Sequence, residues 1–597
     1  MARRAPGSEI SATALQSGAI AMTPRAAAGA EGEAGSKDAL SKLSAAVGEL
    51  RALTLQPILQ RAINCLNAGD YRDGESWALK ALDKDERCGV AWYLLAFARE
   101  KAGDFVSSIK CYESALALMP DQAEVANDLG RLAYRMGMID TAEQLFRHFL
   151  DRYPDHVEGS NNLASALREL SRGDEAIDVL RAAILVHPEA AMLWNALGAV
   201  MSERGDFENA LIFFEEALRL EPDFAKARYN LGNCRLALGD PEGALADCDA
   251  ALKLRIDAGE RQMMRVARSA TLIALGRIRE GWEEYEARLH PQFAGVTHFQ
   301  TDRPLWRPGD DLAGRTFLVI GEQGLGDEVL FANVLEDVQR DLGPDGRLYI
   351  AVEPRLVGLF QRSFPDAVVG GHVTHGIHGR TARFLPFLED HSVIDLWTPI
   401  ASLLRTYRTK VSAFPDRPSF MTADPARVAH WRERLAGAPV GLKVGLLWKS
   451  AIGATARSRY FSPFEKWAPV LATPGATFVN LQYGDCSAEI EAARRDLGVE
   501  IWTPPGIDLK QDLDDVAALC CAMDLIVGFS NATWNLGAAC GAPGWLISTP
   551  GAWPRLACET EYPWYSQARV YAPKTFGAWD GVMAEVAADL HSFVEER

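Results

Sequence analysis

Residues Trp194–Pro222 read WNALGAVMSERGDFENALIFFEEALRLEP, and this stretch decides the architecture of the first half of the chain. It holds two helical segments, and its proline stops the second of them. The same proline occurs at Pro120, Pro154 and Pro188, so the four prolines are 34 residues apart. A fixed period of this length predicts a chain that stacks one small helical unit repeatedly.

Aligned on these prolines, every unit repeats the same residue types at the same offsets. The first helix has a leucine followed by a small residue, and the second has a small residue, a larger one and a third apolar one. Small residues let two helices approach, and the larger side chain fills the gap between units. The first-helix pairs are Leu95/Ala96, Leu129/Gly130, Leu163/Ala164, Leu197/Gly198 and Leu231/Gly232; the second-helix sets begin at Ser108, Ala142, Ala176, Ala210 and Ala244.

This pattern resembles the tetratricopeptide repeat, which implies an all-α solenoid. The solenoid is predicted to span residues 39–290, with degenerate units at both ends. The last unit ends in Gly281, Trp282 and Arg288 and is predicted to dock on the region that begins at Pro291. Residues 1–38 are rich in Ala, Gly and Ser without periodicity, which predicts a flexible leader.

Composition limits the possible partners. The net charge of −18 over 597 residues disfavours a surface that binds nucleic acid or an anionic membrane. No apolar stretch is long enough to span a bilayer, and no apolar core follows Arg3 and Arg4, so we expect a cytoplasmic protein. The ten cysteines lack the spacing of a metal site or a redox pair.

After Pro291 short apolar runs alternate with helical stretches, which predicts parallel sheets covered by helices. Two halves are predicted, residues 291–420 and 421–597. Because open α/β sheets bind ligands beyond the carboxyl ends of their strands, we interpret them as the Rossmann-like halves of a GT-B glycosyltransferase domain. Two unrelated α/β domains fit the periodicity equally well. The predicted strands are 316–321, 347–352, 443–448, 476–483, 524–529 and 544–548, with a helix at 327–342.

The first candidate site is the stretch GEQGLGDE at residues 321–328, which follows a strand and opens a helix. Gly324 and Gly326 let the backbone approach a ligand, and the helix start presents unpaired N–H groups. The alternative is a tight turn in which Asp327 only favours the helix dipole.

A second candidate site is a group of cations after the strand at 443–448. Lys449 and Ser450 end that strand, and Arg457 and Arg459 follow a few residues later. Cations at a strand end suit the phosphate of a sugar nucleotide, although an ordinary solvated loop has the same composition.

The third candidate site is the stretch GFSNATWN at residues 528–535, again between a strand and a helix. Its N–H groups and hydroxyls suit a phosphate, and a simple helix cap is the alternative. Gln482 and Tyr483, at the end of another predicted strand, are also assigned to the donor site. The residues assigned from the third stretch are Ser530, Asn531, Ala532, Thr533 and Asn535.

Gly324–Asp327 with Phe331 is similar to a turn of family 9 glycosyltransferases, the lipopolysaccharide heptosyltransferases, in which the matching aspartate is the proposed base. The chain more closely resembles bacterial proteins that fuse tetratricopeptide repeats to such a domain. That likeness runs through Gly281–Arg288, Gln323–Asp327, Val444–Trp448 and Pro563–Tyr565.

At residues 530–535 the chain has Ser530, Asn531 and Asn535 where family 9 enzymes usually have Asp-Thr and a later histidine. In this it looks more like the repeat-fused flagellin glycosyltransferases of alphaproteobacteria. That resemblance implies a CMP-linked nonulosonic acid of the pseudaminic type as donor and Ser/Thr of flagellin, or another protein, as acceptor. It also implies inverting transfer without metal or cofactor, with Asp327 as general base. The alternatives are a scaffold or chaperone with an inactive transferase-like domain, and a transferase acting on lipopolysaccharide or another glycan.

Overall fold

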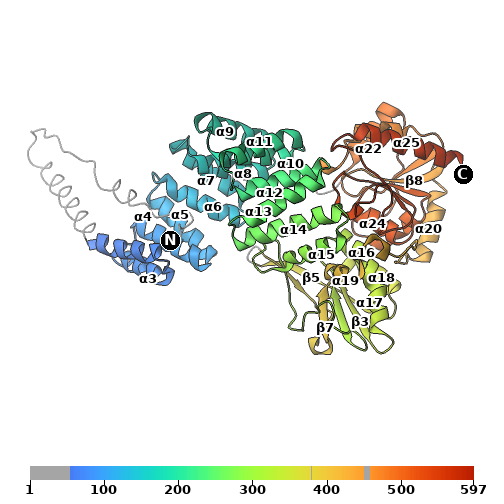
Figure 1. Cartoon of the computed structure of the whole chain (residues 1–597), viewed down its shortest axis with the longest axis horizontal. Coiled ribbons are helices and arrows are strands. Elements are labelled where there is room, and N and C mark those ends of the chain that lie inside the picture. Colours follow the sequence, from blue (N-terminus) through green and yellow to red (C-terminus); the bar gives the residue numbers. More distant parts are fainter. Residues whose placement is uncertain (1–53, 378–379, 450–457) are drawn as a thin grey trace, which may run out of the picture. The chain divides into compact units, whose positions relative to one another are not determined.

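The computed structural model describes residues 54–377, 380–449 and 458–597. It divides into two compact units, whose described parts are residues 54–187 and 188–597 (Figure 1). The predicted leader, residues 1–38, lies outside the described residues. The repeats continue from the first unit into the second, so the last repeats belong to the same compact unit as the α/β region.

The first unit is entirely helical among its described residues. Each repeat consists of two antiparallel helices, and the second one ends two residues before Pro120 or Pro154. In the second unit α11 ends two residues before Pro222 in the same way. The first-unit helices are 54–67, α3 (Tyr71–Leu82), α4 (Gly89–Ala102), α5 (Phe105–Leu118), α6 (Ala123–Arg135), α7 (Ile139–Arg152), α8 (Val157–Glu169) and α9 (Gly173–Val186).

The predicted repeat positions are buried, which confirms the tetratricopeptide solenoid. Tyr112, Phe146 and Phe214 are at most 1% exposed and fill the gaps between helices. A methyl group at Gly130 would lie 2.7 Å from the Phe146 ring, closer than side chains pack, so glycine is required where these helices cross. The turn between helices is also periodic: Gly103 and Gly137 have positive φ, and Ser171 adopts the same backbone without being glycine (φ 59°).

The second unit begins with the remaining repeats and continues into two parallel sheets. The repeat helices are α10 (Ala191–Glu203), α11 (Phe207–Leu220), α12 (Ala225–Ala237), α13 (Pro241–Lys253), α14 (Ala258–Ala274) and α15 (Ile278–Tyr285), followed by η1 (Glu286–Leu289). In the described chain, no helix combines the length and apolar character that a membrane span requires.

The first sheet has the order β4-β3-β2-β7, and all its strands are parallel. A separate, small sheet has the order β1-β6-β5. In it β1 pairs with β6 in parallel, and β5 pairs with β6 in the antiparallel direction. The strands are β1 (Thr297–Phe299), β2 (Thr316–Ile320), β3 (Arg347–Val352), β4 (Val368–Gly371), β5 (Val373–Ile377), β6 (Arg380–Phe384) and β7 (Leu396–Pro399), and the helices are α16 (Leu325–Phe331), α17 (Leu335–Leu342), α18 (Val357–Ser363) and α19 (Leu404–Tyr407).

The second sheet is also entirely parallel, in the order β12-β11-β10-β8-β9. Parallel strands with intervening helices confirm an α/β region. The strands are β8 (Leu442–Leu447), β9 (Ala476–Asn480), β10 (Leu525–Phe529), β11 (Gly544–Ile547) and β12 (Ala568–Tyr571), and the helices are α20 (Pro425–Leu435), α21 (Ala468–Leu471), α22 (Ser487–Leu497), α23 (Leu513–Cys521), α24 (Ala532–Ala539) and α25 (Trp579–Glu595).

The helix predicted at 327–342 is wrong in detail, because a short 3-10 segment, Ala332–Val334, separates α16 from α17. The carbonyl of buried Asn333 accepts hydrogen bonds from Arg408 (2.6 Å) and Arg417 (3.1 Å). That carbonyl therefore accepts hydrogen bonds from two guanidinium groups of a distant segment. The helix is interrupted at the point where these side chains contact it.

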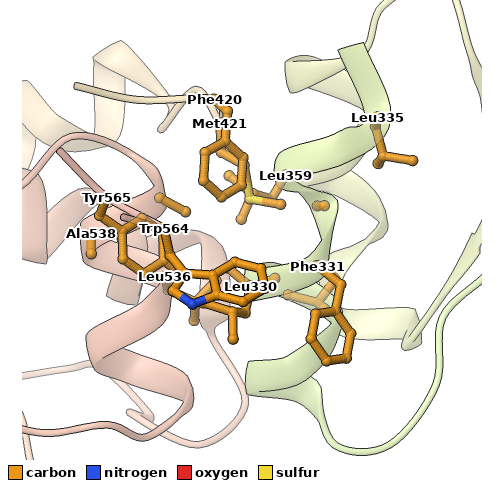
Figure 2. Close-up of a cluster of buried hydrophobic side chains, with 14 of the residues drawn as sticks. Leu330, Phe331, Leu335, Leu359, Phe420, Met421, Leu536, Ala538, Trp564 and Tyr565 are labelled. Atoms are coloured by element: carbon orange, nitrogen blue, oxygen red, sulfur yellow. The ribbon is translucent and has the colours of Figure 1, made fainter. Parts of the chain in front are cut away.

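The two α/β halves share one hydrophobic core. Figure 2 shows Leu330 and Phe331 of α16 close to Trp564 and Leu536, with Phe420 and Met421 of the connecting segment above them. The core contains residues of both sheets as well as Trp282 of the last repeat. Apolar area buried in this way stabilises the contact between the halves and resists their separation.

Candidate functional site

Two of the three predicted sites meet in the structure. The turn after β2 leads into α16, the turn after β10 leads into α24, and these two helices pack against each other. A methyl group placed on Gly326 would lie 3.4 Å from the Cα of Ala532. The carboxyl ends of two strands from different sheets are thereby joined at one place, which is where ligands of α/β proteins bind.

Asp327 lies half-buried in the first turn of α16. One oxygen of its carboxylate accepts a hydrogen bond from the Gly324 N–H at 3.0 Å, as a capping residue does. The structure thus contains a capping contact of Asp327, which agrees with the alternative interpretation of this residue as one that stabilises the helix start. Buried Tyr562 lies nearby: burial raises the pKa of its hydroxyl, and the negative charge of Asp327 raises that pKa further.

The turn before Asp327 is held by an ion pair with the last repeat. Arg288 donates two hydrogen bonds to the Glu322 carboxylate, at 2.7 and 2.8 Å, and both side chains are 2% exposed. The same carboxylate accepts from the Ala401 N–H at 2.9 Å. A buried charge is stable only when it is paired in this way, so Glu322 has a structural role.

A second buried network also holds the turn. The Glu328 carboxylate lies 2.8 Å from the His372 ring nitrogen and accepts from the Glu353 N–H at 2.8 Å. Arg383 donates to the carbonyls of Gly321 and Gln323, the latter a non-glycine residue with φ 61°. These contacts stabilise an unfavourable backbone conformation four residues before Asp327.

Most of the polar groups in the turn after β10 are used within the protein. Asn531 caps α24 by accepting from the Trp534 N–H at 2.9 Å, and Thr533 is 1% exposed. Asn535 donates to the Ser530 hydroxyl at 3.2 Å and accepts from Tyr565 at 2.9 Å. Asn535, which is predicted to contact the donor, therefore also fixes the turn.

Two donors at this turn lack a hydrogen bond of normal geometry within the part of the chain that the structure describes. They are the side-chain nitrogen of Asn531 and the hydroxyl of Tyr562, which is directed toward Ser530. Tyr562 is 2% exposed, so its hydroxyl is withdrawn from bulk water. Unpaired donors beside a helix start are suited to an anionic or polar ligand.

Lys449, the first cation of the predicted phosphate site, binds groups of the protein itself in the structure. The Lys449 ammonium donates to the Asp485 carbonyl at 2.7 Å and pairs with the Glu489 carboxylate. Gln482, 1% exposed, accepts from the backbone N–H groups of Trp448 and Lys449. Ser450 and Arg457 lie outside the described residues.

Near this site a cavity of about 530 Å³ opens after β9. Its lining includes Gln482, Tyr483, Asp485, Asp508 and Lys510. Of the predicted donor residues, Gln482 and Tyr483 are thus beside a cavity, and a polar ligand has room there.

Arg459 contacts the repeats. Its guanidinium donates to the Ser202 carbonyl at 2.5 Å and lies over the rings of Phe207, at 5.5 Å, and Tyr460, at 4.9 Å. Phe576 packs on Phe207 with ring centroids 4.6 Å apart. The side chain predicted to bind phosphate is therefore engaged in attaching α10 and α11 to the C-terminal half.

We expect Arg459→Ala to lower the free energy of unfolding by about 1.5–3 kcal/mol, because a charged hydrogen bond is lost at this contact. Chemical denaturation measures the change, with Lys466→Ala as the control. Lys466 pairs with Asp580, which is 79% exposed, so its removal costs about 0–1 kcal/mol. Unchanged stability together with weaker sugar-nucleotide binding would restore the predicted role of Arg459 in phosphate binding.

Residues that sequence reasoning did not assign hold this site together. Arg288 was marked only as part of a repeat, and Arg383, His372 and Tyr562 had no local pattern to mark them. Their partners are far away in sequence: Arg383 binds a carbonyl 62 residues earlier. Trp282 of the last repeat also forms an aromatic cluster with Trp553 and Trp564 of the C-terminal half, with ring centroids 5.7 to 6.4 Å apart.

Comparisons with known proteins agree with the repeats, and one of them extends over 96% of the chain. Residues 127–191, 162–223 and 202–260 match one tetratricopeptide repeat family, and residues 87–155 match a second. Protein FlbA of Caulobacter vibrioides is 49% identical over 576 residues, which are 96% of this chain and 96% of FlbA.

Solved structures match part of the chain. A thermophilic TPR protein of Thermus thermophilus is 24% identical, with a TM-score of 0.28, and the match covers 31% of this chain and 100% of that one. For MamA the identity is 24% and the TM-score 0.24, covering 27% of this chain and 93% of MamA.

Proposed function

We propose that this chain, which belongs to the family of protein FlbA, is a protein O-glycosyltransferase whose repeats recruit the acceptor protein. Its α/β region would be the transferase, with the GT-B arrangement of two Rossmann-like halves. The donor would be a CMP-linked nonulosonic acid of the pseudaminic type, and the acceptor would be a serine or threonine of flagellin.

The observation that carries this proposal is the meeting of two strand-turn-helix elements from different sheets. Asp327 lies on one turn, and Ser530 and Asn531 lie on the other. A carboxylate on one side and a helix start on the other are what a transfer between a hydroxyl and a phosphate-linked sugar requires. The resemblance of the sequence to flagellin glycosyltransferases that are fused to tetratricopeptide repeats supports the same activity.

In this reaction the acceptor hydroxyl oxygen attacks the anomeric carbon of the donor. The bond from that carbon to the phosphate oxygen breaks, CMP departs with the bonding electrons, and the configuration inverts. Asp327 takes the proton of the hydroxyl as general base. The start of α24 and the hydroxyl of Tyr562 would stabilise the negative charge that grows on the departing phosphate.

A scaffold or chaperone with an inactive transferase-like domain is the second candidate. The contacts of Asp327 with Gly324 and of Lys449 with Glu489 favour it, because each occupies a predicted catalytic or donor-binding group within the protein. The tetratricopeptide repeats suit the binding of a partner protein in either case.

Two measurements separate the candidates. Flagellin from cells that lack this protein should lose mass equal to the attached sugars, whereas an unchanged mass excludes flagellin as the acceptor. A panel of sugar nucleotides should raise the melting temperature of the purified protein, with a CMP-linked acid giving the largest rise. Ligand at about one hundred times its Kd adds about 2.7 kcal/mol of stability, so a scaffold that binds no donor would show no rise for any of them.

A further inference from the structure

Two cysteines of the second unit meet where α23 and α24 end. Cys521 is the last residue of α23, and Cys540 directly follows α24. The sulfur of Cys521 lies 3.5 Å from the Cys540 carbonyl oxygen, and the two thiol groups are close enough to interact directly. Both residues are partly exposed. Thiols in contact need little movement to form a disulfide, whose sulfur atoms are about 2 Å apart.

The two thiols differ in acidity. The hydrogen bond with the Cys540 thiol lowers the pKa of the Cys521 thiol, and the positive charge of Arg432 on α20 lowers it as well, although burial opposes them. The same hydrogen bond, together with burial, raises the pKa of the Cys540 thiol. Because the thiolate is the nucleophile in thiol oxidation, Cys521 is the thiol that reacts first and Cys540 the one that follows.

The surface beside Cys521 suits the approach of a small oxidant. Arg432 and Ala522, the residue after Cys521, help to line a cavity of about 340 Å³. Lys443 lines the same cavity, so two cationic side chains are placed there. A partly exposed position near cations is typical of reactive cysteines. The preceding residue, Cys520, shows the opposite character: it is 0% exposed, and burial raises the pKa of its thiol.

We propose that Cys521 and Cys540 form a redox site in which a hydroperoxide oxidises Cys521 and Cys540 converts the product to an intramolecular disulfide. In the first step the Cys521 thiolate attacks one oxygen of the hydroperoxide, the O–O bond breaks, and the departing oxygen takes up a proton as water or an alcohol. In the second step the Cys540 sulfur attacks the sulfur of the resulting sulfenic acid, loses its proton and releases water. The two hydrogens and two electrons lost by the thiols reduce the hydroperoxide.

This disulfide would lie beside the segment that connects the two α/β halves. The carbonyl of Ala539, one residue before Cys540, accepts hydrogen bonds from the N–H groups of Phe420 at 3.1 Å and Met421 at 3.0 Å in that segment. Oxidation would therefore fix to α23 the end of α24 that holds the connecting segment. The redox site does not depend on the proposed transfer of sugar.

The test uses the full chain, oxidised with hydrogen peroxide, blocked with N-ethylmaleimide and digested without reductant for mass spectrometry. We expect one pair of peptides joined through Cys521 and Cys540, which dithiothreitol separates. Before oxidation, iodoacetamide should alkylate Cys521 at least about tenfold faster than Cys520, because only the thiolate reacts and Cys520 is buried. This comparison needs no substitution, so it tests the reactivity of Cys521 in the unaltered fold.

Two variants test the separate roles of the thiols. In Cys540→Ser the sulfenic acid has lost the thiol that resolves it, so dimedone should label Cys521 after oxidation. In Cys521→Ser, Cys540 should stay reduced.

The matched control is Cys558→Ser, which should form the disulfide as the unaltered protein does. Cys558 is also partly exposed, and its sulfur also lies near a carbonyl, that of Leu556 at 3.9 Å. The proposal is overturned if no disulfide joins Cys521 to Cys540, if Cys520 is alkylated as fast as Cys521, or if Cys540 is oxidised in Cys521→Ser.

Discussion

An Asp327→Asn variant should stay folded, bind donor and acceptor, and transfer sugar about 10²–10⁴-fold more slowly, because loss of a general base has an effect of that size. Asparagine retains an oxygen that can accept the hydrogen bond now made by the Gly324 N–H, so the start of α16 is preserved. The cost in folding stability should be only about 0.3–1 kcal/mol, from the lost charge at the helix start. Turnover is measured by the mass of flagellin after incubation with donor.

The control for this experiment is Asp424→Asn. Asp424 accepts from the Ala426 N–H at 2.8 Å and caps α20, so it shares the capping chemistry but belongs to a different helix start. Its variant should transfer sugar at the normal rate. Near-normal transfer by folded Asp327→Asn would make Asp327 a capping residue alone. Glu322 and Glu328 are then poor replacements as the base, because both are buried in ion networks.

The second large effect is expected for Arg288→Met. This change leaves the Glu322 carboxylate buried at 2% exposure without its cation. Removing one partner of a buried ion pair destabilises a protein by about 3–5 kcal/mol. The transition of the second compact unit should therefore occur at clearly lower denaturant concentration, as followed by tryptophan fluorescence.

Two further variants show whether the buried charge causes this loss. Arg288→Met/Glu322→Gln removes both charges and should recover part of the stability, because no unpaired carboxylate remains. Arg495→Met removes an exposed cation, 65% accessible and paired with Asp496, and should leave the stability unchanged. A loss below about 1 kcal/mol for Arg288→Met would mean that water reaches Glu322 and that the pair does not hold the turn.

Sequence reasoning was accurate where short-range rules apply. The strand at 347–352 was predicted to the residue, and the strand at 524–529 to within one residue, because continuous apolar runs are typical of buried parallel strands. It was less accurate for the helix at 327–342, which is interrupted at Asn333 by Arg408 and Arg417, 75 and 84 residues further along the chain. No local pattern carries information about such a partner.

The sequence alone determined the stacked repeats, the parallel α/β region and the two glycine- or serine-containing turns. Those features follow from periodicity and from turn chemistry, which act over a few residues. Only the tertiary structure decided which charges remain available at the turns. Arg459 binds a carbonyl 257 residues earlier, and Lys449 pairs with Glu489. A side chain takes the partners that folding brings to it, and their separation along the chain follows no period that a sequence displays.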